Sequence, residues 1–239
     1  MSDQMNAPMS PSTGIASWFS IWMEAVTKPS EQTYVAMVER PEATTNTAYL
    51  WVFIAGTISW FIQSLIGMVL SLVGFTLQSS VFSQLGGTGS SIGVSLAITV
   101  CGAPIVGGLS VLGLIINAGI VQWIAKMFGG TGTFAKLVYA SAAISVPFTL
   151  VSVILSPFSA IPVLGICTGL ISLVVSIYAV VLQVTAVKGI NNFGWGQALG
   201  SVFIPVIVFA CCLIGPIAVM RLLGPKIGNT FSSINNSLP

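Results

Sequence analysis

Residues 48–77 read AYLWVFIAGTISWFIQSLIGMVLSLVGFTL, thirty residues without a charged side chain. A helix of about 20 apolar residues crosses the hydrocarbon core of a bilayer, so this stretch is long enough to span a membrane. Four further apolar blocks follow, at residues 92–125, 135–156, 161–187 and 198–223. The sequence therefore predicts an all-α, polytopic integral membrane bundle of about five transmembrane helices.

The composition of the 239-residue chain agrees with a membrane protein. Apolar residues make up 55% of the chain and charged residues 5%, whereas soluble domains carry about 25% charged residues. All five acids lie in the first 42 residues, and the chain has no histidine. Paired-carboxylate catalysis, carboxylate metal cages and histidine-ligated zinc are therefore excluded from the spanning part. We expect no enzymatic activity, no catalytic residue, no cofactor and no metal.

The chain divides into four segments by composition and patterning. A polar lead rich in Ser, Pro and Met, expected to be disordered, precedes two short amphipathic helices, the five-span domain and a short tail. The boundaries are 1–14, 15–46, 47–224 and 225–239. Within the spanning domain, Pro104 and its neighbouring glycines leave open whether the second apolar block is one helix or a broken one.

The first short helix is predicted from apolar residues that recur three and four apart between residues 15 and 26. Its apolar stripe carries Trp18, Phe19 and Trp22. Two tryptophans on one stripe favour a helix that lies in the headgroup layer, with these three side chains as its anchor. The alternative is a helix folded against the bundle. A second short helix is expected at residues 31–40.

Lysine and arginine near the ends of the spans predict the orientation of the bundle. With a cytoplasmic N-terminus, one side holds Lys28, Arg40, Lys126, Lys136 and Lys188, and the other holds Arg221 and Lys226. This bias predicts an N-terminus in the cytoplasm and a C-terminus outside. Because the bases mark span ends, the net charge of +2 does not indicate a nucleic-acid partner.

Small residues spaced four apart are typical of helices that pack closely in lipid. The candidate helix-packing pairs are Gly67 with Ser71, Gly165 with Gly169, and Gly196 with Gly200. We expect these pairs mainly to pack helices within one bundle, and the alternative is an oligomer contact.

Asn117, Gln122 and Gln183 are candidate polar contacts inside the spans. Interhelical hydrogen bonds are the simpler interpretation, and a solute path is the alternative, which would require all three to converge on one cavity. The glycine-rich stretches 86–89 and 129–132 resemble nucleotide loops but lack a preceding strand and a downstream acid. They are therefore interpreted as flexible connections between spans.

Two later stretches carry a family resemblance. Residues 129–151 read GGTGTFAKLVYASAAISVPFTLV, and residues 171–208 read ISLVVSIYAVVLQVTAVKGINNFGWGQALGSVFIPVIV. They contain a Gly-rich turn before Phe134, a span that includes Tyr139 and Pro147, and a late span followed by a short polar loop. In order and spacing these elements resemble the Yip family, the Rab-interacting-protein family of small polytopic membrane proteins.

The resemblance implies five helical spans, a cytosolic N-terminus and a short outer tail, and it supplies no catalytic residue. Eukaryotic members are implicated in vesicle traffic and in binding prenylated Rab GTPases. The acidic-Leu-Tyr-Gly-Pro motif of those members is absent here. The resemblance therefore implies a prokaryotic-type member in a cytoplasmic membrane.

The leading functional hypothesis is a non-enzymatic scaffold or accessory subunit of a membrane complex. Its partners would be the lipid bilayer and other integral membrane proteins, or further copies of itself. Two alternatives stay open. One is a channel or permease for an uncharged small solute, and the other is a membrane-traffic factor that binds lipidated GTPases if the source is eukaryotic.

Overall fold

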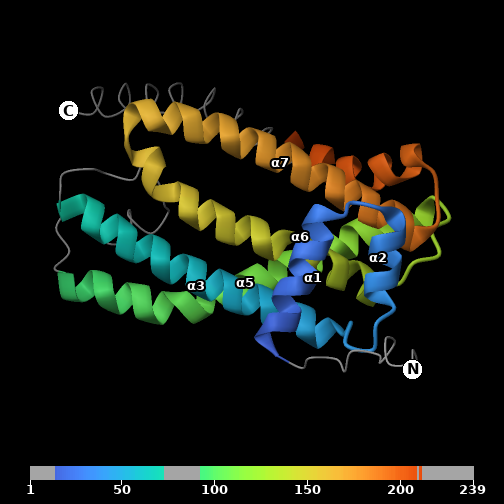
Figure 1. Cartoon of the computed structure of the whole chain (residues 1–239), viewed down its shortest axis with the longest axis horizontal. Helices are drawn as coiled ribbons and strands as arrows, with labels where there is room; N and C mark the ends of the chain where they lie inside the picture. Colours follow the sequence, from blue (N-terminus) through green and yellow to red (C-terminus); the bar gives the residue numbers. More distant parts are fainter. Residues whose placement is uncertain (1–13, 73–91, 209, 212–239) are drawn as a thin grey trace, which may run out of the picture.

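The computed structural model describes residues 14–72, 92–208 and 210–211, and these residues form helices without a β-strand (Figure 1). The elements in order are α1 (Ile15–Thr27), α2 (Glu31–Val38), α3 (Thr45–Leu72), α5 (Ile92–Met127), α6 (Phe134–Leu155), the 3-10 helix η1 (Ser156–Ala160) and α7 (Pro162–Asn191). An apolar helix, Trp195–Val208, follows α7. The predictions on residues 1–13, 86–89 and 225–239, and those on Arg221 and Lys226, fall outside the described residues.

Four of the described helices are long and apolar enough to cross a membrane: Thr45–Leu70, Leu96–Met127, Phe134–Ser159 and Val163–Asn191. The all-α, polytopic membrane bundle is thus confirmed. The fifth expected span begins in the shorter helix Trp195–Val208, and its expected continuation to residue 223 lies beyond the part of the chain that is described.

The second apolar block is one helix. α5 continues from Ile92 to Met127 with Pro104 inside it, so the glycines near this proline do not break the helix. One of them lets α3 and α5 approach closely, because a Cβ added at Gly107 would lie 2.9 Å from the carbonyl oxygen of Phe53 and would overlap the Thr57 hydroxyl. Small residues here serve packing in lipid rather than chain reversal.

α6 is the central helix of the bundle. It contacts α1, α3, α5 and α7. In its apolar 18-residue segment 56% of the residues are buried, against 22% to 28% in the corresponding segments of the other three spans. η1 then reverses the chain, and α7 begins at Pro162, where a proline at the first helical turn loses no hydrogen bond. A short turn therefore joins the third and fourth apolar blocks.

α1 and α2 form as expected, with α2 ending at Val38, two residues earlier than predicted. α1 is folded against the bundle: Trp18 and Trp22 lie edge-on to the Trp51 ring of α3, with centroid distances of 6.1 and 5.7 Å. Phe19 is 61% exposed. Two of the three proposed anchors thus pack on protein, and the depth of α1 in a membrane stays a prediction.

Candidate functional site

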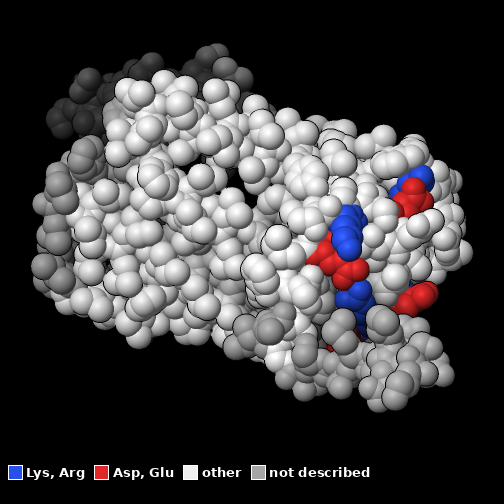
Figure 2. Space-filling view, viewed as in Figure 1, with Lys and Arg blue, Asp and Glu red and all other residues white. Residues whose placement is uncertain are grey.

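The charged residues within the described ranges gather at one end of the bundle, which we call the charged end (Figure 2). There α1 and α2 pack beside the start of α6 and the last turn of α7. The charged residues are Glu24, Lys28, Glu31, Glu39, Arg40, Glu42, Lys126, Lys136 and Lys188. The five bases expected on one side of the membrane therefore do lie together, and the side they face stays a prediction.

Three ion pairs connect the elements of the charged end. Arg40 contacts Glu24 at 2.7 Å and joins the end of α2 to α1. Lys188 of α7 contacts Glu31 at 2.6 Å, and Lys136 of α6 contacts Glu39 at 3.6 Å. The Lys188 side chain is 16% exposed and its ammonium also lies 4.4 Å from the centre of the Trp195 ring. Lys188 is therefore the best-shielded cation of the three.

Two tyrosines hold the C-terminal turn of α1. The Tyr34 hydroxyl donates to the Ala25 carbonyl at 2.7 Å, and the Tyr178 hydroxyl donates to the Val26 carbonyl at 2.6 Å. The last carbonyls of a helix have no partner within the helix, so these phenols satisfy them. Burial raises the pKa of Tyr34 above its ordinary value, which keeps this hydroxyl a neutral donor. α1 is thus hydrogen-bonded to both α2 and α7.

Replacing Lys188 with methionine should destabilise the charged end more than replacing Lys136 does. The first change removes the shorter ion pair and the contact with Trp195, at a cost of about 1–2 kcal/mol. The second removes a longer, more exposed pair and should cost less than about 0.5 kcal/mol. Thermal unfolding in detergent, followed by tryptophan fluorescence, measures both. Equal losses would contradict this ranking.

The glycine-rich turn at residues 129–132 is a packed, hydrogen-bonded turn, which corrects its interpretation as a flexible connection. Gly129 ends α5 with φ +87°, a conformation that glycine adopts without strain. The Asn191 side-chain oxygen at the end of α7 accepts from the Gly132 amide at 3.2 Å. A Cβ at Gly130 or Gly132 would lie 2.7 Å from this oxygen. Glycine is needed at positions 130 and 132 because the turn packs tightly against the end of α7.

Gln122, one of the three intramembrane amides, completes this network. Its side-chain nitrogen donates to the Gly132 carbonyl at 2.8 Å and to the Asn191 side-chain oxygen at 2.9 Å. Gln183 instead donates to the Ser141 hydroxyl at 2.7 Å and links α7 to α6, while Asn117 is exposed on α5. Two of the three amides form interhelical hydrogen bonds, and the three do not converge on a cavity.

The predicted small-residue pairs have different surroundings in the structure. A Cβ at Gly165 would approach the Ser159 carbonyl at 3.0 Å, and one at Gly200 would meet the Phe128 ring at 3.1 Å. Gly169 and Gly196 face open space. The side chain of Ser71, the partner of Gly67, is not among those described.

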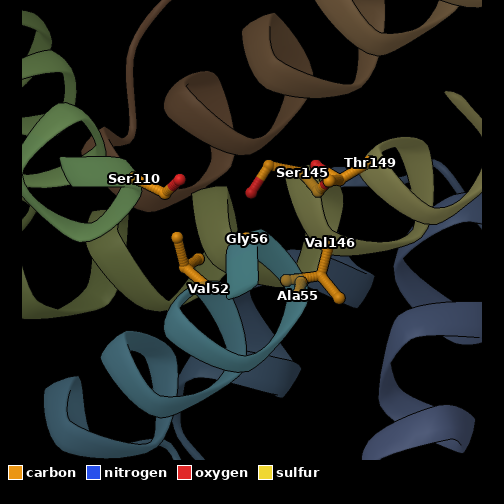
Figure 3. Close-up of a pocket in the computed structure, with 7 residues that line it drawn as sticks. All are labelled: Val52, Ala55, Gly56, Ser110, Ser145, Val146 and Thr149. Carbon is orange, nitrogen blue, oxygen red and sulfur yellow. The ribbon is translucent and has the colours of Figure 1, made fainter. Parts of the chain in front are cut away.

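Sequence reasoning missed a hydroxyl-lined pocket between α3, α5 and α6 (Figure 3). Ser110, Ser145 and Thr149 contribute its hydroxyls, and its volume is about 40 Å³. The available signal was the recurrence of Ser141, Ser145 and Thr149 four apart in an otherwise apolar span. Pockets for organic ligands have volumes of about 300–1,000 Å³, so this one is too small for such a ligand.

A larger groove, about 340 Å³, lies at the charged end between α2 and the end of α7. It is lined by Glu31, Gln32, Val35, Ala36, Glu39, Gly189 and Asn192. Gly189 permits the close approach here, because a Cβ on it would lie 2.9 Å from the Glu31 carbonyl oxygen. In the described part of the chain, no group of three or more His, Cys, Asp or Glu residues is placed to hold a metal ion.

Comparison with known proteins supports the membrane-bundle assignment. Searches of curated proteins and of solved structures gave no match. A family model described as the Yip1 domain matches residues 23–215, a range that includes the C-terminal end of α1, all the described spans and the charged end. The chain is therefore an integral membrane protein that belongs to the Yip1 domain family.

Proposed function

We propose that this protein is a non-enzymatic scaffold or accessory subunit that packs against other membrane proteins, further copies of itself or lipids. The observation that carries the proposal is the exposed apolar face on the first half of α7. Ile166, Leu170 and Val174 are 71%, 61% and 66% exposed. α7 runs along the edge of the bundle and packs mainly on α6 and α2 (Figure 1), so among the described residues nothing covers this face.

The same face combines large and small side chains. Gly169 lies one helical turn after Ile166, and open space surrounds it. A small residue between large apolar ones lets the backbone of a second helix approach closely, which is how helices associate in lipid. We propose that this neighbour is a protein helix and that the charged end faces the cytoplasm of a prokaryotic cell, with the C-terminus outside. A lipidated-GTPase role would instead require a eukaryotic source.

Photo-crosslinking in native membranes tests the proposal. A photoreactive residue at Ile166 should give a discrete protein adduct, and Gly169→Leu should reduce that adduct several-fold by blocking close approach. Gly113→Leu is the matched control, because Gly113 also faces open space but lies on α5. A strictly monomeric particle in mild detergent, with no adduct and no co-purifying protein or lipid, would refute the scaffold role.

A further inference from the structure

The hydroxyl-lined pocket lies where three spanning helices meet. α3 supplies Val52, Ala55 and Gly56 to one side, α5 supplies Ser110, and α6 supplies Ser145, Val146 and Thr149. In Figure 3 the hydroxyl oxygens of Ser110 and Ser145 point toward the space between them. The recess is partly open, because Ser145 is exposed and Ser110 and Thr149 are half-buried, so its hydroxyl oxygens can be reached by a small polar occupant.

The hydrogen bonds of these hydroxyls define what the occupant must provide. Ser110 donates to the Val106 carbonyl at 2.8 Å, Ser145 to the Ala142 carbonyl at 3.3 Å and Thr149 to the Ser145 carbonyl at 2.9 Å. A hydroxyl has one hydrogen to donate and two lone pairs that accept. Since each hydrogen is already used within its own helix, the oxygens offer the pocket only acceptor sites. The occupant must therefore be a hydrogen-bond donor.

Size and charge restrict this donor further. An ordered water needs about 10–15 Å³ of such space and two to four polar partners, and this partly open pocket offers about 40 Å³ and three hydroxyl oxygens. A metal cation or ammonium ion would meet no compensating charge, because the chain has no acid after Glu42. Water is neutral and carries two hydrogens.

We propose that this pocket is a water-binding site, in which a bound water donates to Ser110 on α5 and to Ser145 or Thr149 on α6. Gly56 explains why the site can form, because a Cβ at that position would lie 2.7 Å from the Ser110 hydroxyl oxygen. The water then connects two helices whose hydroxyls each donate within their own helix, next to the tight contact between α3 and α5.

Water-edited solid-state NMR on the unmodified protein in lipid bilayers tests the site directly. Magnetisation from water should reach the Cβ signals of Ser110 and Ser145 several-fold faster than that of Ser176. Ser176 is a matched reference, because it is a helical serine that donates to a carbonyl four residues earlier and does not line the pocket. Transfer to Ser110 and Ser145 no faster than to Ser176 would overturn the proposal.

A double-mutant cycle tests the bridge. Ser110→Ala removes the hydroxyl that would accept from the water on α5. The combined Ser145→Ala and Thr149→Val changes remove the hydroxyls that would accept from it on α6. If one water joins both ends, the fall in melting temperature with all three changes should be smaller than the sum of the two separate falls. Strictly additive falls would argue against a shared water. If the α6 variants do not fold, the NMR result on the unmodified protein decides.

Discussion

Gly107→Ala is expected to lower the melting temperature of the detergent-solubilised protein by roughly 6–12 °C, at about 2–4 °C per kcal/mol. The added methyl would meet the Phe53 carbonyl oxygen at 2.9 Å and overlap the Thr57 hydroxyl. A backbone oxygen cannot turn aside as a flexible side chain can, so α3 and α5 must separate. Overpacking of this kind costs about 3 kcal/mol.

Gly108→Ala is the matched control for this prediction. Gly108 is the next residue of α5, and nothing lies within 4 Å of a Cβ added there. Alanine is also the better helix former by about 0.5–1 kcal/mol, so the melting temperature should stay constant or rise slightly. Equal losses for the two variants would show that α5 needs flexibility at this point rather than a close contact with α3.

Asn191→Leu is the second large effect, expected to cost about 2–4 kcal/mol. The change keeps the approximate size of the side chain but removes the oxygen that accepts from the Gly132 amide and from Gln122. It also removes the amide that donates to the Val187 carbonyl at 3.0 Å. Buried polar groups of the turn then lose partners that water cannot replace. Thermal unfolding in detergent measures the loss.

Asn117→Leu is the control of the same chemistry. Asn117 is exposed on α5, so its replacement exchanges one lipid- or detergent-facing side chain for another and should leave the melting temperature unchanged or slightly higher. A comparable loss from both variants would mean that amides stabilise the bundle wherever they occur. A loss confined to Asn191 assigns the effect to the turn at residues 129–132.

Much of the fold could be predicted because its signals are local in the sequence. A run such as residues 48–77 identifies a span by its length, and the spacing of Trp18 and Trp22 identifies α1 as a helix. Pro162 similarly indicates the start of α7. None of these inferences requires knowledge of what a residue meets in the folded chain.

The contacts that organise the site depend on partners far away in the sequence. Gly132 and Asn191 are 59 positions apart. The sequence around either residue does not show whether the turn is tightly packed or flexible. Gly107 and Ser110 likewise acquire their roles from the register of α3 and α6 against α5. Of the three amides chosen from the sequence, Gln122 and Gln183 have interhelical hydrogen-bond partners, whereas Asn117 is exposed. Neither burial nor a hydrogen-bond partner can be inferred from the sequence of a single apolar segment.

The hydrogen bond from Tyr178 of α7 to α1 constrains the order in which the helices assemble. Val26 and Tyr178 are 152 positions apart, and Glu31 and Lys188 are 157 apart. During synthesis, which proceeds from the N-terminus, the first two helices leave the ribosome long before either partner exists. Their final docking must therefore wait until α7 has entered the membrane, so a docked N-terminus reports that the described spans have all been inserted.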